Sequence, residues 1–299
     1  MSDLRDRYGI QAVLLLSMAI WGLNVTIVKQ LTNSLDPTMI AMLRMLVASA
    51  TLTTIWLIRR PVLARLDRRQ WMGLAACAFL MVYMNQILFT EGMVRTTATN
   101  GALIMALSPL ASGIIAAIAF GERLGPVRLL GVLLGFVGVA IIILGHAGAN
   151  LAEMGMGDLL VVAGILSFSS GGAFIQGIAR RLDALTISGI IYVMGAMMLI
   201  AHTGLWGPGY GGALPGSAWI WFLIIFSGSV STAIVNLIWN NAIARIGVAR
   251  AAVFLYWVPV FGGAFAALLL DEHLGWNHLV GLVAVMAGTY LGTRTRNPV

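Results

Sequence analysis

Charged side chains are scarce in this sequence. Only 10% of its 299 residues are Asp, Glu, Lys or Arg, whereas 60% are hydrophobic and the mean hydropathy is +0.93. A soluble domain of average composition carries about 25% charged residues. So much apolar surface requires a lipid environment, and the composition excludes an ordinary soluble domain.

Cysteine and catalytic signatures are also lacking. The single cysteine, Cys77, lies in an apolar run and excludes a disulfide framework. We find no His, Asp or Glu cluster with metal-ligand spacing, no glycine-rich phosphate loop and no Gly-x-Ser-x-Gly motif. The sequence therefore predicts no catalytic residue, no metal site and no cofactor, so the protein is not expected to be an enzyme.

Titratable groups are missing from the middle of the apolar runs. The 11 acidic residues and the 4 histidines all fall at termini, in loops or near the ends of those runs. A proton-coupled carrier usually has a titratable group along its path through the membrane. The sequence therefore gives no positive indication of proton coupling, and uniport, exchange and proton antiport all stay open.

What the sequence does contain is a series of long apolar runs. A membrane-spanning helix needs about 20 mostly apolar residues. By this measure the chain is an all-α membrane protein with ten transmembrane helices, near 10–31, 38–58, 71–91, 96–120, 126–145, 158–180, 185–204, 218–241, 248–271 and 276–293.

The basic residues indicate the orientation. If the spans alternate in direction, the loops that carry most arginines fall on one side: Arg5, Arg7, Arg59, Arg60, Arg65, Arg68, Arg69, Arg123, Arg128, Arg180, Arg181, Arg245, Arg250, Arg294 and Arg296. Cytoplasmic loops are the basic ones, so both termini are predicted to be cytoplasmic. The net charge of +7 is spread over these clusters and forms no nucleic-acid-binding face.

One stretch of the chain occurs twice. Residues 95–138 align without a gap on residues 245–288, at an offset of about 150, and the shift places Pro109 on Pro259, Glu122 on Glu272 and Gly138 on Gly288. We therefore predict two repeats, 1–146 and 147–299. Because each half has an odd number of spans, five, the second half enters the membrane from the opposite side and is inverted relative to the first. Such an inverted repeat predicts a central site that opens to each side of the membrane in turn.

Two features of the repeat concern backbone geometry. Pro109 and Pro259 lie within spans, where each removes a helical hydrogen bond, and we predict that both act as hinges. The fifth and tenth spans carry closely spaced glycines, such as Gly131, Gly135 and Gly288, which allow helix backbones to approach. Packing within the chain is favoured over dimerisation, and both monomer and homodimer stay open.

Polar and aromatic side chains inside the spans are the candidate substrate-binding residues. Such groups are costly in lipid and usually face a cavity or a neighbouring helix. The predicted set is Trp21, Asn24, Arg44, Tyr83, Gln86, Gln176, Tyr192, Asn236, Trp239, Tyr256 and Trp257. Arg44 is the strongest candidate, because a buried arginine needs an anion or a cage of carbonyl groups. It is either a structural tie between helices or a contact for a substrate carboxylate.

Several of these residues resemble the drug/metabolite transporter superfamily, of the EamA type. The resemblance rests on Trp21-Gly22-x-Asn24, on Pro37 before Arg44, and on the repeated proline followed by Glu122-x-Leu124 and Glu272-x-Leu274. It covers nearly the whole chain and implies ten helices in two inverted five-helix repeats around a central cavity. Phe168 stands where that pattern has a tryptophan, so the second-half pocket departs from it.

The resemblance extends to bacterial inner-membrane exporters of amino acids, in particular of aromatic ones. It implies a secondary transporter that exports amino acids, aromatic or large and neutral, by alternating access. The aromatic residues of the candidate set are compatible with such a substrate. The main alternative is a carrier of phosphorylated or nucleotide-linked metabolites, based on Lys29 and Arg44. A multidrug exporter and a membrane enzyme are less favoured.

Overall fold

The computed structural model describes residues 2–61, 66–119, 126–144, 151–178, 182–209, 215–246 and 253–293. Within these ranges the chain is helical and contains no strand. The elements are α1 (Ser2–Leu31), α2 (Pro37–Arg59), α3 (Arg68–Cys77), η1 (Ala78–Met84), α4 (Asn85–Arg95), α5 (Ala98–Met105), α6 (Ser108–Ala119), α7 (Pro126–Leu144), α8 (Leu151–Ile178), α9 (Ala184–Leu205), α10 (Ala218–Ile225), η2 (Phe226–Ile234), α11 (Val235–Ile246), η3 (Val253–Tyr256), α13 (Trp257–Leu270) and α14 (Trp276–Thr293). The all-α prediction is confirmed for the part of the chain that the structure describes.

Helical segments coincide with the ranges predicted as spans. Six helices of the described chain are long and apolar enough to cross a membrane: Gln11–Leu31, Pro37–Arg59, Arg68–Arg95, Gly155–Gly172, Ala184–Leu205 and Ala218–Trp239. Leu129–Ile141 and Trp257–Leu270 are shorter apolar helices. The count of ten spans, the division at residue 146 and the side on which the termini lie stay predictions.

Several helices begin at side chains that accept hydrogen bonds from the first helical turn. Asp36 precedes Pro37 and accepts from the amide of Thr38, and Asp183 accepts from the amide of Thr186. Asp67 and Gln70 form a reciprocal capping box at α3. These caps fix where α2, α3 and α9 start, and so fix which side chains face the interior.

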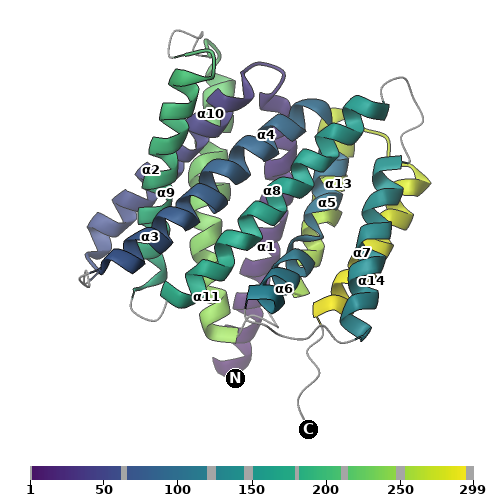
Figure 1. Cartoon of the computed structure of the whole chain (residues 1–299), viewed down its shortest axis with the longest axis horizontal. Helices are drawn as coiled ribbons and strands as arrows, with labels where there is room; N and C mark the ends of the chain where they lie inside the picture. The colour runs from purple at the N-terminus through teal and green to yellow at the C-terminus, as the bar shows by residue number, and fades with distance from the viewer. Residues whose placement is uncertain are drawn as a thin grey trace.

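The helices form one bundle whose first and last elements run in opposite directions. Figure 1 shows that α1 begins and α14 ends at the same end of the molecule. The most extensive helix pairs are α7 with α14, α4 with α8, α1 with α13 and α2 with α9. In Figure 1 the pair α7–α14 lies at one edge and α2, α9 and α10 at the other, so α1 and α8 run through the middle.

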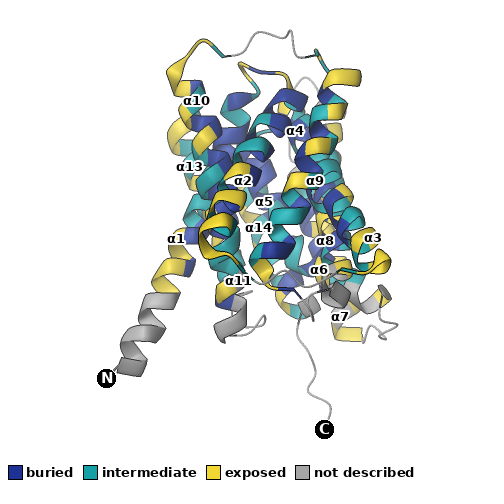
Figure 2. Ribbon diagram, turned by 90° about the vertical axis from the view of Figure 1, so that its left-hand side faces the viewer, coloured by how far each residue is buried: buried dark blue, intermediate teal, exposed yellow. Residues whose placement is uncertain are grey.

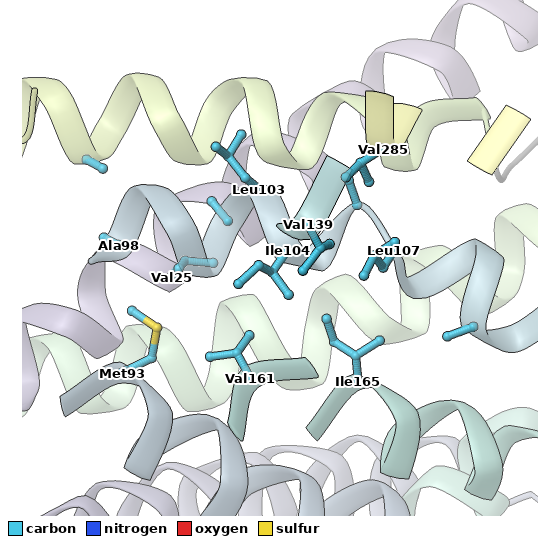
Figure 3. Packing of buried hydrophobic residues seen from close by; sticks show 14 of the residues in the cluster. Val25, Met93, Ala98, Leu103, Ile104, Leu107, Val139, Val161, Ile165 and Val285 are labelled. Carbon is cyan, nitrogen blue, oxygen red and sulfur yellow. The ribbon is translucent and has the colours of Figure 1, made fainter. Parts of the chain in front are cut away.

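Apolar packing joins the two predicted halves. One cluster combines Val25 of α1, Met93 of α4 and Ile104 of α5 with Val161 of α8 and Val285 of α14. Figure 3 shows these side chains between the helices. Figure 2 shows exposed residues on the outside of the bundle. Many of the exposed residues are large and apolar, such as Leu133, Phe136 and Leu279, as expected of helices that face lipid.

Glycines allow α7 and α14 to pack at backbone distance. A Cβ atom added to Gly138 would lie 2.7 Å from the nitrogen of Val285 and 2.8 Å from the oxygen of Gly281. A Cβ atom on Gly288 would collide with the backbone of Gly135. The glycine-lined faces of these two helices therefore cover each other within one chain.

Gly138→Ala is expected to destabilise the protein through this contact. The new methyl group would meet two backbone atoms and the Val285 side chain at 2.7–2.8 Å, and overpacking of this kind costs about 1–3 kcal/mol. Thermal unfolding in detergent is the measurement. The matched control is Gly189→Ala in α9, where an added Cβ atom has no neighbour within 4 Å. Equal unfolding temperatures for the two variants would contradict this account of the helix pair.

Both prolines predicted as hinges lie at interruptions of helical structure. Helix α5 ends at Met105 and α6 begins at Ser108, one residue before Pro109. The Met105 carbonyl, which Pro109 leaves without its helical donor, accepts from the Ser108 hydroxyl at 2.7 Å. Pro259 lies in the first turn of α13, directly after the 3-10 turn η3. The hinge role itself stays a prediction.

Candidate functional site

Two π-helical turns frame the candidate site. The turn η1 interrupts the third predicted span and η2 interrupts the eighth. Shifting residues 78–84 of η1 by about 150 places them on residues 228–234, inside η2. The sequence repeat therefore recurs in the backbone. Such turns are rare and frequently lie at functional sites. Here they precede Gln86 in one half and Asn236 in the other.

Arg44 lies at the centre of a polar network between the two π-helical turns. Its side chain, on α2, is only 2% exposed. Its Nε atom donates to the Ser227 hydroxyl at 2.5 Å and its Nη1 atom donates to Gln86 Oε1 at 3.0 Å. The Ser227 hydroxyl in turn donates to Asn24 Oδ1 at 2.5 Å. The network therefore joins α1, α2, α4 and η2.

The network continues from Gln86 to α8. Gln86 Nε2 donates to Asn85 Oδ1 at 3.2 Å, and Asn85 Nδ2 donates to the Gly164 carbonyl at 2.9 Å. Every hydrogen-bond partner of Arg44 in the described chain is neutral. The one salt bridge among the described residues joins Arg95 and Glu91, outside this network. A buried cation surrounded by neutral groups provides a place for an anionic group to bind.

Tyr192 and Asn236 lie on the second-half side of Arg44. Asn236 Nδ2 donates to the Thr232 carbonyl at 2.6 Å and more weakly to the Tyr192 hydroxyl at 3.4 Å. The Tyr192 side chain is within electrostatic range of Arg44. The Tyr192 phenol therefore lies near the guanidinium group, and the Asn236 amide lies beside that phenol.

Trp21 and Trp239 form an aromatic pair beside η2. Their ring centroids are 5.7 Å apart at an interplanar angle of 55°. The Trp21 indole nitrogen donates to the Ser231 carbonyl at 2.9 Å, which fixes the ring against the π-helical turn. Both residues are partly exposed.

Two predicted site residues, Tyr83 and Trp257, are not brought into this group. The Tyr83 hydroxyl lies 2.8 Å from His202 Nδ1, on α9, and its ring packs edge-on against that histidine. Trp257 is 46% exposed and contacts Phe261 on its own helix. The side chains of Gln176 and Tyr256 lie outside the described residues, as does the first repeat's Glu122-x-Leu124 motif.

Sequence reasoning missed Ser227, which links Asn24 to Arg44. Nothing in the local sequence separates it from Ser229 or Ser231, since all three lie in the same apolar run. The repeat gives no signal either, because the shift of about 150 places Ser227 on Cys77. Among the described residues no group of three or more His, Cys, Asp or Glu side chains is arranged to hold a metal ion.

The comparisons with known proteins match this architecture along the whole chain. The model of the EamA-like transporter family matches residues 9–144 and again residues 155–294. The chain belongs to the EamA-like transporter family. This EamA-like protein is therefore a membrane-spanning transporter, and the family resemblance inferred from the sequence is confirmed.

Relatives of this EamA-like transporter cover nearly its full length. It is 28% identical over 302 residues to a "Probable amino-acid metabolite efflux pump" of Escherichia coli (strain K12), covering 95% of this chain and 96% of that protein. It is 22% identical over 281 residues to the "Uncharacterized transporter YoaV" of Bacillus subtilis (strain 168), covering 92% and 94%. A solved crystal structure, 18% identical, has the same fold with a TM-score of 0.68 over 95% of this chain and 98% of that one.

Proposed function

We propose that this EamA-like transporter exports amino acids, aromatic or large and neutral, across the bacterial inner membrane by alternating access. Arg44 binds the substrate carboxylate in this proposal. The observation that carries it is the burial of Arg44 at 2% exposure among neutral partners. A carboxylate supplies the missing negative charge and matches the geometry of a guanidinium group.

The groups around Arg44 suit the rest of an amino acid. Gln86 and Asn236 carry amide oxygens, and Tyr192 carries a phenol oxygen, all of which can accept from an ammonium group. Trp21 and Trp239 are partly exposed residues whose ring centroids lie 5.7 Å apart. Apolar rings pack on such surfaces in offset or edge contacts. The name of the Escherichia coli relative supports the same substrate class.

Alternating access is supported by the internal repetition. The family model matches the chain twice, and the two π-helical turns recur at an offset of about 150. Repeats of inverted topology place a substrate site at their interface, open to each side in turn. Arg44 and Gln86 come from the first repeat, and Ser227 and Asn236 from the second, so a substrate between them contacts both repeats.

Counterflow tests the proposed function. The purified protein is placed in liposomes loaded with unlabelled amino acids or, in a separate set, with an unlabelled sugar phosphate. Entry of trace labelled tryptophan, leucine, threonine or sugar phosphate is followed, each against its own unlabelled form. Counterflow needs no coupling ion. We expect transient accumulation of tryptophan above that in empty liposomes. Accumulation of the sugar phosphate alone, with no amino acid moved, would instead support the phosphorylated-metabolite carrier.

Trp21→Ala is expected to reduce the preference of the transporter for tryptophan over leucine. Loss of the indole removes both an aromatic contact, worth about 0.5–1.5 kcal/mol, and the bond to Ser231. Counterflow of tryptophan should fall several times more than counterflow of leucine. Trp219→Ala is the matched control, because Trp219 is 53% exposed and stacks on Phe222 away from the network. A uniform loss for all substrates would argue against ring recognition by Trp21.

A further inference from the structure

Asp158 is a carboxylate buried within a membrane span. Helix α8 begins at Leu151, so Asp158 lies well inside the helix and within the apolar segment Gly155–Gly172, and its exposure is 0%. Asp158 is the fourth residue of that segment, in keeping with the expectation that every acid lies in a loop or near the end of a span, but the sequence does not indicate that its side chain is fully buried. Ionisable side chains buried at such positions are candidates for proton or ion relays.

The hydrogen bonds of Asp158 tie α8 to the turn between α4 and α5. The Thr96 hydroxyl donates to Asp158 Oδ1. The Asn100 amide nitrogen donates to Oδ1 at 3.2 Å and to Oδ2 at 3.0 Å. Thr96 ends α4, and Asn100 lies in the first turn of α5. The carboxylate therefore holds both sides of a single turn.

Two other charged groups hold the same turn from neighbouring elements. Lys29 of α1 donates to the carbonyl of Met93, in the last turn of α4, at 2.8 Å. Glu272, after α13, accepts from the backbone amides of Ala98 and Thr99 at 2.7 and 2.8 Å. A cation at a helix C-terminus and an anion at a helix N-terminus both interact favourably with the helix dipoles. These groups bind backbone atoms, whereas Asp158 is bound by side chains that can rotate.

Helix α8 also meets α4 at backbone distance. A Cβ atom on Gly92 would lie 2.8 Å from the Gly157 oxygen, and one on Gly157 would lie 2.8 Å from the Arg95 carbonyl carbon. Such close packing admits no gap between the two helices at this end. The α4–α5 turn and the first half of α8 must separate if a path is to open between them.

We propose that Asp158 is a proton-binding site, and that its protonation releases the α4–α5 turn from α8 and opens this end of the transporter. The proposal rests on the proposed transport function and adds its energy coupling. The basic loops predict that this turn faces the outside, so Asp158 takes up a proton from outside when substrate has left. The proton is released to the inside after the turn has closed on α8 and the opposite end has opened, which regenerates the carboxylate and exchanges one proton for each exported substrate.

The protonation step changes donors and acceptors in a defined way. A proton taken from water adds to one carboxylate oxygen, which then carries an O–H donor in place of an accepting lone pair. A proton on Oδ2 faces the Asn100 N–H group as a second donor, so the shorter of the two Asn100 contacts is lost and the 3.2 Å contact to Oδ1 is left. Loss of the charge also weakens the remaining bond from Thr96, since charge-assisted hydrogen bonds are the stronger ones.

The other charged groups around the turn are placed differently. Glu91 and Arg95 of α4 form a salt bridge of 2.7 Å with side chains 30% and 35% exposed. Lys29 and Glu272 are partly exposed and bound to helix ends. Among the titratable groups at the turn that the structure describes, Asp158 is the one that is fully buried and bound by side chains.

Two flux measurements on the same proteoliposomes test the proposal. Tryptophan counterflow at equal pH reports transport itself. Efflux of loaded tryptophan with and without an acidic exterior, with trapped pyranine to follow protons, reports coupling. For the unmodified protein we expect the acidic exterior to speed efflux about fivefold or more. In Asp158→Asn the pH response and the pyranine signal should both be lost, while exchange at equal pH persists at a reduced rate.

Glu91→Gln is the matched control, since it removes a carboxylate of the same region that lies in an exposed salt bridge. It should keep the pH response. A pH response that survives in Asp158→Asn overturns the proposal. The proposal is also overturned if the unmodified protein shows counterflow but its tryptophan efflux does not respond to an acidic exterior. That outcome does not depend on how well the variant folds. Absence of counterflow by the unmodified protein contradicts the proposed function instead.

Discussion

Arg44→Met is expected to abolish amino acid transport while leaving the fold intact. Removing one member of a buried charge pair costs about 2–5 kcal/mol of binding, which is roughly 30-fold to several thousand-fold in affinity. Methionine fills a similar volume without a charge. It removes the cost of burying a guanidinium group among neutral partners, which offsets the loss of the hydrogen bonds to Ser227 and Gln86. The combination of lost counterflow and an unchanged or raised unfolding temperature is the expected result.

This pair of measurements separates the two roles that the sequence left open for Arg44. A purely structural tie to Ser227 and Gln86 predicts a lower unfolding temperature in Arg44→Met and proportionate loss of transport. A substrate contact predicts loss of transport alone. Arg95→Met is the control, because Arg95 is 35% exposed in a surface salt bridge and its loss is expected to cost little. Normal counterflow by Arg44→Met would contradict the proposed binding role.

Ser227→Ala is expected to weaken substrate affinity about tenfold. The Ser227 hydroxyl accepts from Arg44 and donates to Asn24, so its removal frees the guanidinium group to rotate and leaves Asn24 Oδ1 without this donor. A lost hydrogen bond to a charged group is worth about 1.5–3 kcal/mol. The concentration dependence of tryptophan counterflow measures the effect, which should raise the half-saturating concentration more than it lowers the maximal rate.

Ser229→Ala controls for the loss of any serine hydroxyl from η2. Ser229 lies two residues further along the same turn, and its hydroxyl donates to the Ile225 carbonyl of its own helix at 2.5 Å. Its loss is expected to change affinity little, because the contact is local. If Ser227→Ala and Ser229→Ala behaved alike, the network from Asn24 to Arg44 would have no special role in binding.

The sequence predicted the helices better than the contacts between them. Apolar run length determines where helices lie, so the predicted spans coincide with helical segments. Polar residues in lipid must find partners, so the sequence predicts Asn24, Arg44 and Gln86 as site residues, and the structure joins all three in one network. The direction in which each side chain points is harder to predict from the sequence. Tyr83 and Gln86 are three residues apart, which in a regular α-helix places them on the same face. Tyr83 lies within the π-helical turn η1, however, and contacts His202 instead of joining Gln86.

Asp158 illustrates a second limit of sequence reasoning. Hydropathy placed the start of its span at residue 158, whereas α8 begins at Leu151 and carries Asp158 inside the bundle. A hydropathy pattern records where polarity changes along the chain, not how deeply a neighbouring turn covers a side chain. The burial of Asp158 depends on Thr96 and Asn100, which are about 60 residues away in sequence.

Competition by tryptamine tests the central claim most directly, because tryptamine is tryptophan without its carboxylate. Binding of labelled tryptophan to the purified transporter is measured with rising tryptophan, tryptamine or indole-3-propionate as competitor. If Arg44 binds the carboxylate, tryptamine should compete about 30-fold or more weakly than tryptophan. Indole-3-propionate should retain part of the affinity, and Arg44→Met should show no preference for carboxylate-bearing competitors. Equal competition by tryptamine and tryptophan would contradict the account.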